Sequence, residues 1–333
     1  MNIKRIFAAC LALFMLLGVM GTLSSCGLVL SKIAERIEQE HTVEVNDKEE
    51  DTFDEHYRVD IDGAEYVRND DNKSYSLERI YECPEDGNVV VASEYNGMPV
   101  TSINRSAFSM CLDLKSVTIG DSVTEIGARA FSNCINLTEI NMGDGVKTIG
   151  EYAFDECRSL TNIIMGDSVE VIGSWAFLGC IYLTDVTLSN NVRVIEDYAF
   201  YNCIRLANIN AVDSLTTIGD HAFSGCKHLT TCIAVGKGVT SIGEEAFAAC
   251  EDLQSAVISN NTASISKGAF RACTGLMIVT IPDSVTEIGD KAFEYCKGLT
   301  TVNYTGTQEQ WKAISGSATA FSDKTTINYN YSE

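Results

Sequence analysis

The amino-acid sequence predicts a solenoid, a fold in which similar short coils of chain stack on one another. The pair Ala-Phe, followed three residues later by Cys, recurs nine times between Ala107 and Cys296. Successive phenylalanines are 23 residues apart, except for one separation of 24 between Phe223 and Phe247. A fixed period of about 20 to 30 residues is typical of solenoids. Because a single unit cannot bury its own apolar residues, each unit needs a copy above and below it.

Three columns of apolar residues recur with this period. The phenylalanines are Phe108, Phe131, Phe154, Phe177, Phe200, Phe223, Phe247, Phe270 and Phe293. The cysteines are Cys111, Cys134, Cys157, Cys180, Cys203, Cys226, Cys250, Cys273 and Cys296. A leucine follows each cysteine after three residues. We therefore expect a continuous apolar core in which like residues lie over like.

The spacing inside one unit predicts its local structure. Segments 117–119 and 123–126 begin and end with apolar residues and suit short strands. Segment 130–137 has the i, i+3, i+6 spacing of a tight helical turn. We expect coils of strand, turn, strand and short helical turn, with equivalent strands pairing in parallel about 4.8 Å apart, so that nine coils span about 43 Å.

The amino terminus has the pattern of an export signal. Lys4 and Arg5 precede an uncharged run at 6–20. The sequence Leu-Ser-Ser-Cys at 23–26 resembles the bacterial lipobox, which implies lipid attachment at Cys26 after cleavage. The alternative is an uncleaved membrane span. Both interpretations place the rest of the chain outside the cytoplasmic membrane.

The chain after this signal becomes polar and acidic up to about residue 55, which is typical of a solvated tether. Strand-like runs follow at 88–91 and 99–103, with a turn at Asn96-Gly97. The stretch 57–101 lacks the full repeat. We interpret it as an N-terminal cap, because the end of a solenoid core must be covered by an atypical unit.

The nine units resemble the BspA-like leucine-rich repeats of bacterial surface proteins. The resemblance covers about 100–304, and the segment 304–311 with Ile314 is similar to the caps of that family. It implies a leucine-rich-repeat solenoid and extracellular recognition, often adhesion. It brings no catalytic residues with it.

The carboxyl end leaves the repeat pattern. Segment 307–315 has helical composition and a polar strand is expected at 325–331. Trp311, Ile314 and Phe321 are expected to cover the last coil. The predicted organisation is a lipoprotein signal peptide at 1–25, a tether at 26–56, an N-terminal cap at 57–101, the array at 102–304 and a C-terminal cap at 305–333.

Two units depart from the consensus. The unit after Leu229 has one extra residue near Cys232. The next unit has Ala256, Thr262 and Ser266 where its neighbours carry larger apolar residues or glycine. We expect these sixth and seventh coils to be the most weakly packed.

The charge excludes some partners. The chain has 46 acidic and 24 basic residues, a net charge of -22. This excess repels nucleic acid and anionic lipid headgroups, so neither is expected to bind the folded part. Solubility of a surface protein explains the acidic excess better than selection for a cationic ligand does.

The cysteine column predicts free, buried thiols. Parallel side chains from successive coils suit disulfide geometry poorly, so cysteine is expected to act as a small apolar residue. Cys83 and Cys232 lie outside the column and are not expected to pair with each other. No histidine lies among the column, so no zinc site or other cofactor is expected.

An acid or amide column provides a weaker metal candidate. It comprises Asp121, Asp144, Asp167, Asn190, Asp213, Asn260 and Asp283, with Lys237 at the remaining position. Stacked carboxylates can hold calcium. Turn formation explains the column better, because short acceptors cap backbone amides in turns.

The sequence predicts no enzyme. It contains four histidines and no recognisable nucleophile motif, phosphate-binding loop or dinucleotide fingerprint.

The strongest binding candidate is the position two residues before each phenylalanine. Successive coils place there Arg129, Tyr152, Trp175, Tyr198 and His221, with Tyr182 and Tyr201 expected nearby. Exposed aromatic residues suit a protein hot spot or a sugar platform. The alternative is that the rings only shield the core. A polar sheet face made by Thr118, Asn141, Thr187 and Asn210 is a second candidate.

Together these observations predict a lipid-anchored surface protein whose array binds an extracellular protein. A structural envelope protein and a glycan-binding module are the alternatives.

Overall fold

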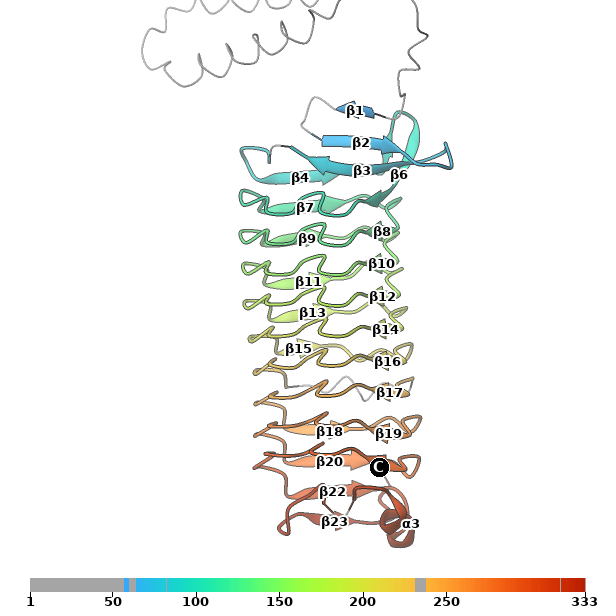
Figure 1. Ribbon diagram of the computed structural model, residues 1–333, viewed down its shortest axis with the longest axis vertical. Coiled ribbons are helices and arrows are strands. Elements are labelled where there is room, and N and C mark those ends of the chain that lie inside the picture. The colour runs from blue at the N-terminus through green and yellow to red at the C-terminus, as the bar shows by residue number, and fades with distance from the viewer. Residues whose placement is uncertain (1–56, 60–63, 82, 231–237, 318, 333) are drawn as a thin grey trace, which may run out of the picture. The chain divides into compact units, whose positions relative to one another are not determined.

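The computed structural model describes residues 57–59, 64–81, 83–230, 238–317 and 319–332. They form a β-solenoid of about 11 coils, about 23 residues apart, with little helix (Figure 1). The predicted solenoid is therefore confirmed. It is longer than the nine repeats because strands before and after the array also join its sheets.

The first column of strands forms an 11-stranded sheet. In spatial order its strands are β1 (Tyr57–Val59), β2 (Ala64–Arg68), β3 (Tyr75–Ile80), β6 (Met98–Ile103), β8 (Glu125–Ile126), β10 (Thr148–Ile149), β12 (Val171–Ile172), β14 (Val194–Ile195), β16 (Thr217–Ile218) and β17 (Ser241–Ile242), with β5 (Glu94–Tyr95) paired to β6. Strands β1 to β3 pair antiparallel, as do β5 and β6, and the other neighbours from β3 onward pair in parallel.

The second column of strands forms three shorter parallel sheets. They are β4 (Asn88–Val91), β7 (Ser116–Ile119) and β9 (Glu139–Asn141); β11 (Asn162–Ile164), β13 (Asp185–Thr187) and β15 (Asn208–Ile209); and β18 (Ser255–Val257), β20 (Ile278–Ile281), β22 (Thr301–Tyr304) and β23 (Thr326–Asn328). Most neighbours are paired with an offset of one 23-residue repeat, as in Val186 with Ile209.

The first column is interrupted at one coil. Strand β17 contacts β19 (Ser264–Ile265), but β19 belongs to a separate sheet with β21 (Glu287–Ile288). The same coil buries Thr262, whose hydroxyl donates to Val239 O at 2.9 Å. This is the seventh coil, one of the two for which the sequence predicts the weakest packing. The extra residue near Cys232 lies outside the described residues.

The predicted helical turn consists of successive tight turns. Ala130 N donates to Gly127 O at 3.1 Å, and Cys134 N donates to Phe131 O at 3.2 Å. Arg129 and Asn133 have positive φ, 59° each, so the segment is not a regular helix.

The phenylalanine column forms the centre of the core. Phe131 and Phe154 are fully buried, and their rings stack 5.0 Å apart at 2°. Each further neighbour in the column is also stacked. Burying one such side chain stabilises the fold by about 1.5 to 3 kcal/mol relative to exposure.

Both ends contain the expected secondary structure. The turn at Asn96-Gly97, with φ of 50° and 74°, joins β5 to β6. At the other end α3 (Gln308–Ala313) begins with a capping box between Thr307 and Gln310. Trp311 and Ile314 are buried, and Phe321 stacks on Phe293 at 4.9 Å. The predicted cover of the last coil is thus present.

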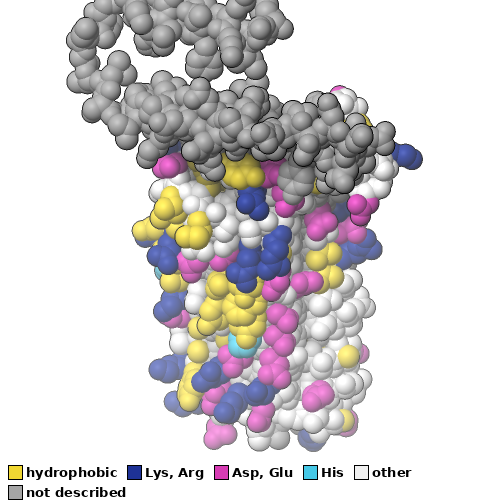
Figure 2. All heavy atoms as spheres, turned by 45° about the horizontal axis from the view of Figure 1, so that its top comes forward, with side chains coloured by type: hydrophobic (Ala, Val, Ile, Leu, Met, Phe, Trp, Pro, Cys, Tyr) yellow, Lys and Arg dark blue, Asp and Glu magenta, His cyan; other side chains and the backbone are white. Residues whose placement is uncertain are grey.

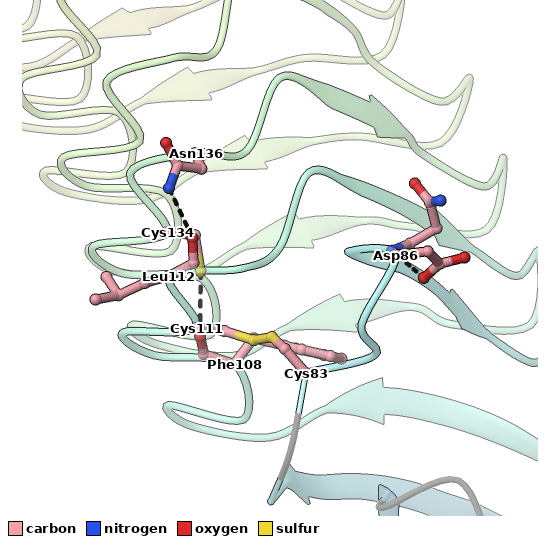
Figure 3. Close-up of a disulfide and its surroundings, with 8 residues drawn as sticks. Cys83, Asp86, Phe108, Cys111, Leu112, Cys134 and Asn136 are labelled. Atoms are coloured by element: carbon pink, nitrogen blue, oxygen red, sulfur yellow. Dashed lines mark hydrogen bonds between the residues drawn. A yellow bond between two sulfur atoms is a disulfide. The ribbon is translucent and has the colours of Figure 1, made fainter. Parts of the chain in front are cut away.

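The expectation of nine free cysteines was wrong for Cys111. This cysteine forms a disulfide with Cys83, with Cα atoms 6.3 Å apart (Figure 3). The physical reason is that β4 pairs in parallel with β7, which places the chain entering β4 beside the chain entering β7. The bridge joins the cap to the first coil rather than two members of the column.

None of the other eight cysteines of the column forms a disulfide within the described residues. Each thiol donates to the carbonyl of a phenylalanine in the coil before its own, as Cys134 Sγ does to Phe108 O at 3.1 Å. The same contact recurs along the column. Burial raises the pKa of Cys134 to about 12. These thiols are therefore weak nucleophiles in the folded protein.

We predict that removing the disulfide loosens the N-terminal cap. The cysteines are 28 residues apart, and opening a loop of this length raises the entropy of the unfolded chain, which destabilises the fold by about 3 to 4 kcal/mol. In Cys83→Ala, Cys111→Ala, amide exchange should accelerate in β4 and β7 and not in β20. Wild type in reducing agent should behave like the variant. A uniform change along the array would contradict a local role.

Candidate binding surface

Five side chains on consecutive coils form a continuous stack, which we call the aromatic stripe: Arg129, Tyr152, Trp175, Tyr198 and His221. The Arg129 guanidinium lies 4.4 Å from the Tyr152 ring centre. Trp175 stacks on Tyr152 at 5.7 Å and on Tyr198 at 3.8 Å, with both pairs parallel within 4°. His221 stacks on Tyr198 at 4.6 Å. The structure therefore brings all five predicted residues together.

The two further tyrosines named from the sequence differ in position. Tyr201 meets the stripe edge-on, 5.5 Å from Tyr198 and 6.2 Å from Trp175. Tyr182 makes no ring contact with the stripe among the described residues. Tyr182 is 45% exposed, and the Arg205 guanidinium lies 4.6 Å from the centre of its ring. Tyr201 thus belongs to the same surface and Tyr182 does not.

The stripe presents ring edges and polar tips. Its aromatic residues are half-buried, and each ring has a neighbour on at least one face. Figure 2 shows a hydrophobic patch on one face, with basic side chains above it, a histidine at its lower end and acidic side chains beside it. Because Trp175 and Tyr198 are covered on both faces, their flat surfaces are not available to a ligand.

The backbone at the stripe is left-handed. Trp175 and Tyr198 have φ of 60° and 57°, and Tyr152 and His221 are similar. Such a conformation costs roughly 1 to 2 kcal/mol for a residue other than glycine. Gly268 occupies the equivalent position two coils after His221, with φ of 63°. The backbone alone does not explain large aromatic residues at this position.

Acidic residues line the C-terminal half of the stripe. Asp197 and Asp220 directly precede Tyr198 and His221. Asp197 Oδ1 accepts from Asp220 N at 2.8 Å, and Asp220 Oδ1 accepts from Glu244 N at 2.6 Å. Burial, followed by the Asp220 carboxylate, raises the pKa of Tyr198. The carboxylates are therefore held in fixed positions beside the rings.

Asp155 is a buried carboxylate near the stripe that the sequence did not indicate. It follows Phe154, the position that Tyr201 occupies two coils later. It is 7% exposed, and its Oδ1 has no hydrogen-bond partner among the described residues. Burial raises the pKa of its carboxyl, opposed in part by Ser132 and Arg129. The available signal was an acid between Ser132 and Leu178 in the row of residues that follow the phenylalanines.

The alternative sheet face also exists, with different character. Thr118, Asn141 and Thr187 are exposed on β7, β9 and β13, and Asn210 is exposed directly after β15. Ile164 lies in the same row and is 63% exposed. Asn210 Oδ1 accepts from Leu188 N at 2.6 Å, so this amide is used within the fold.

The aspartate column forms hydrogen bonds between coils. Asp121 Oδ1 accepts from Asp144 N at 3.2 Å, and Asp144 Oδ1 accepts from Asp167 N at 3.4 Å. Lys237 lies outside the described residues. Among the residues that the structure describes, no three His, Cys, Asp or Glu side chains are grouped to hold a metal ion.

The fold and this surface define a repeat protein that presents a rigid stack of side chains. A family model for the BspA type leucine rich repeat region matches residues 101–230 and 194–328, in six copies. These matches cover more than half of the chain, so it belongs to the BspA-type leucine-rich-repeat family. No curated protein matches the sequence.

Several solved structures resemble the chain. The leucine rich repeat protein of T. pallidum is 24% identical, with a TM-score of 0.45, covering 72% of this chain and 89% of that one. A leucine rich cell surface protein of Faecalibacterium prausnitzii is 23% identical, with a TM-score of 0.41, covering 80% and 98%. A leucine-rich repeat protein from Bacteroides ovatus is 24% identical, with a TM-score of 0.35, covering 82% and 100%.

Within the described ranges, no helix has both the length and the apolar character needed to cross a membrane.

We predict that Asp155→Asn stabilises the protein at neutral pH. The folded-state pKa of Asp155 lies above the unfolded one, so the folded protein binds more protons between the two values. Its stability therefore falls as the pH rises through this window, and the loss persists above it. The amide removes this loss, with an expected gain of about 1 to 3 kcal/mol at pH 7.5.

The measurement is urea unfolding of wild type and variant at several pH values. The difference in unfolding free energy should narrow as the pH falls from 7.5 toward 4. Asp113→Asn, at an exposed carboxyl, is the control and should change little at any pH. A gain from Asp155→Asn that does not depend on pH would contradict the argument.

Proposed function

We propose that this chain is an exported, lipid-anchored surface protein whose array binds an extracellular protein through the aromatic stripe, without catalysis. The observation that carries this proposal is the residue choice at one backbone position. Four consecutive coils place a large aromatic or imidazole ring where the left-handed backbone favours glycine. The left-handed backbone recurs at this position in every coil, so the choice of rings there on four consecutive coils, and not the backbone itself, supports a role in binding.

The ring geometry favours a protein partner over a glycan. A sugar ring packs flat on the face of an aromatic side chain, and here the faces of Trp175 and Tyr198 are covered by their neighbours. The ring edges, the tyrosine hydroxyl groups and the indole N–H of Trp175 remain for a partner to contact. Such rigid, amphipathic groups are enriched at protein hot spots. A glycan-binding module and a purely structural envelope protein are therefore secondary alternatives.

The lipid anchor rests on the sequence alone, because residues 1–56 lie outside the described part. The charged start, the apolar run and Cys26 match an export signal that ends in a lipidation site. The polar tether would hold the array away from the membrane. Membership in a family of bacterial repeat proteins is consistent with this location.

For the anchor, we predict that Cys26→Ala abolishes lipid attachment. Cells that express the full chain and are fed a labelled fatty acid should incorporate label into wild type and not into the variant. The matched control is Cys10→Ala, which changes a cysteine inside the apolar run. Equal labelling of all three proteins would overturn the assignment of Cys26.

For the stripe, we predict that Trp175→Gly, Tyr198→Gly abolishes capture of an extracellular partner. Glycine suits the left-handed backbone, so the change removes rings without adding strain. Loss of two central aromatic anchors should weaken binding by about 2 kcal/mol or more, roughly thirtyfold. The assay is pull-down from host and bacterial surface extracts, followed by a binding curve with the purified partner.

The control variant is Ile164→Ala, Thr187→Ala on the sheet face, with unfolding measured for each protein. Retained binding by the control and loss by the stripe variant is the expected result. The reverse would move the site to the sheet face. Capture by neither variant nor wild type would favour the structural alternative.

A further inference from the structure

The carboxylates around the stripe fall into two groups. One group already has cationic partners: Glu156 pairs with Arg158, Glu244 with Lys267, and Glu245 with Arg271 at 3.9 Å. Three other carboxylates, Asp155, Asp197 and Asp220, have no salt-bridge partner among the described residues, and the same holds for Glu151 and Glu196. The three aspartates border the stripe, either in the preceding position or in the row that holds Tyr201.

Asp197 and Asp220 are oriented for an external ligand. Each uses Oδ1 to accept a backbone N–H from the next coil, at 2.8 and 2.6 Å. The second oxygen of each carboxylate has no partner in the described part of the chain, and both residues are exposed. Two negative groups one coil apart are thus fixed in place beside Tyr198 and His221. Their ordering has no entropic cost at binding.

Asp155 differs from Asp197 and Asp220 in its burial. Its carboxylate is more than nine-tenths buried, and one oxygen lacks a donor within the described residues. Buried acceptors are normally satisfied, and an exception calls for an explanation. The exposed Arg129 nearby lies over Tyr152 instead of forming a salt bridge with Asp155. Because this oxygen is itself buried, a ligand at the surface does not reach it, and Asp155 makes no contact in the proposal that follows.

The rings then determine how a cationic side chain can approach. Because Trp175 and Tyr198 are covered on both faces, a cation cannot sit over either ring. The aliphatic stems of lysine and arginine can pack along ring edges while their charged ends reach the carboxylates beside them. Apolar edges and unpaired carboxylates along one line therefore match a segment that combines apolar and basic residues.

Resting on the proposed function, we propose that the partner of the stripe presents a Lys- or Arg-bearing protein segment, recognised by Asp197 and Asp220 beside the rings. The net charge of -22 attracts such a segment over longer range. The local carboxylates then supply specificity, because they repel competing segments that carry negative charge.

The test uses the full chain in detergent and a displayed library of random 12-residue peptides. Peptides that bind wild type and not Trp175→Gly, Tyr198→Gly are collected as stripe-dependent. They should be enriched in lysine and arginine relative to the starting library. Synthetic copies should bind Asp197→Asn, Asp220→Asn about tenfold more weakly, a change of about 1.4 kcal/mol.

The substitutions are chosen to separate local from general charge effects. Asparagine keeps the Oδ1 acceptor that each aspartate uses in the fold. Glu125→Gln, Glu139→Gln removes the same charge from exposed positions on β8 and β9 and should leave affinity within twofold. An equal loss in this control would reduce the effect to net charge and overturn the proposal.

The remaining outcomes are also decisive. Stripe-dependent peptides without a basic excess would overturn this inference and leave the proposed binding function intact. A library with no stripe-dependent binder would overturn both. Binding that falls with rising salt in wild type, and less steeply in Asp197→Asn, Asp220→Asn, is the expected signature of the local carboxylates.

Discussion

The structure depends on backbone hydrogen bonds that join successive coils at the phenylalanine turn. Phe131 N donates to Ala153 O at 2.7 Å, and the residues two before and two after, Arg129 and Asn133, donate to the next coil at 2.8 Å. Both flanking residues have positive φ. These left-handed residues, four positions apart, allow every second N–H from residue 129 to residue 133 to point toward the next coil. Each coil is therefore held by its neighbour, as a unit that cannot fold alone requires.

This constraint also creates the candidate site. A residue that donates to the next coil with positive φ is one whose side chain the core does not use. Tyr152, Trp175 and Tyr198 occupy that position on consecutive coils, so their rings stack at the spacing of the backbone. The same bonds that order the core thus space the exposed side chains. The rings of neighbouring phenylalanines stack in the same way inside the core.

The period was sufficient to predict the coil, the columns and the stacked rings, because all three follow from one repeated register. Features outside the register were not predictable. Cys83 precedes the first full repeat, so its approach to Cys111 depended on the pairing of β4 with β7. The left-handed backbone was hidden because the residues there are mostly not glycine or asparagine. The lack of a hydrogen-bond donor for Oδ1 of Asp155 within the described residues depends on contacts with adjacent coils, which the sequence does not specify.

The position of the stripe along the array bears on how it binds. The stripe runs from Arg129 to His221, and the paired strands β8 to β17 cover this stretch without interruption. The break in the first column lies beyond it, between β17 and β19. A partner would therefore meet side chains fixed by a continuous ladder, with little ordering left to occur on binding. Preorganisation of this kind strengthens binding without additional contacts, and the unpaired carboxylates beside the rings are held by the same ladder.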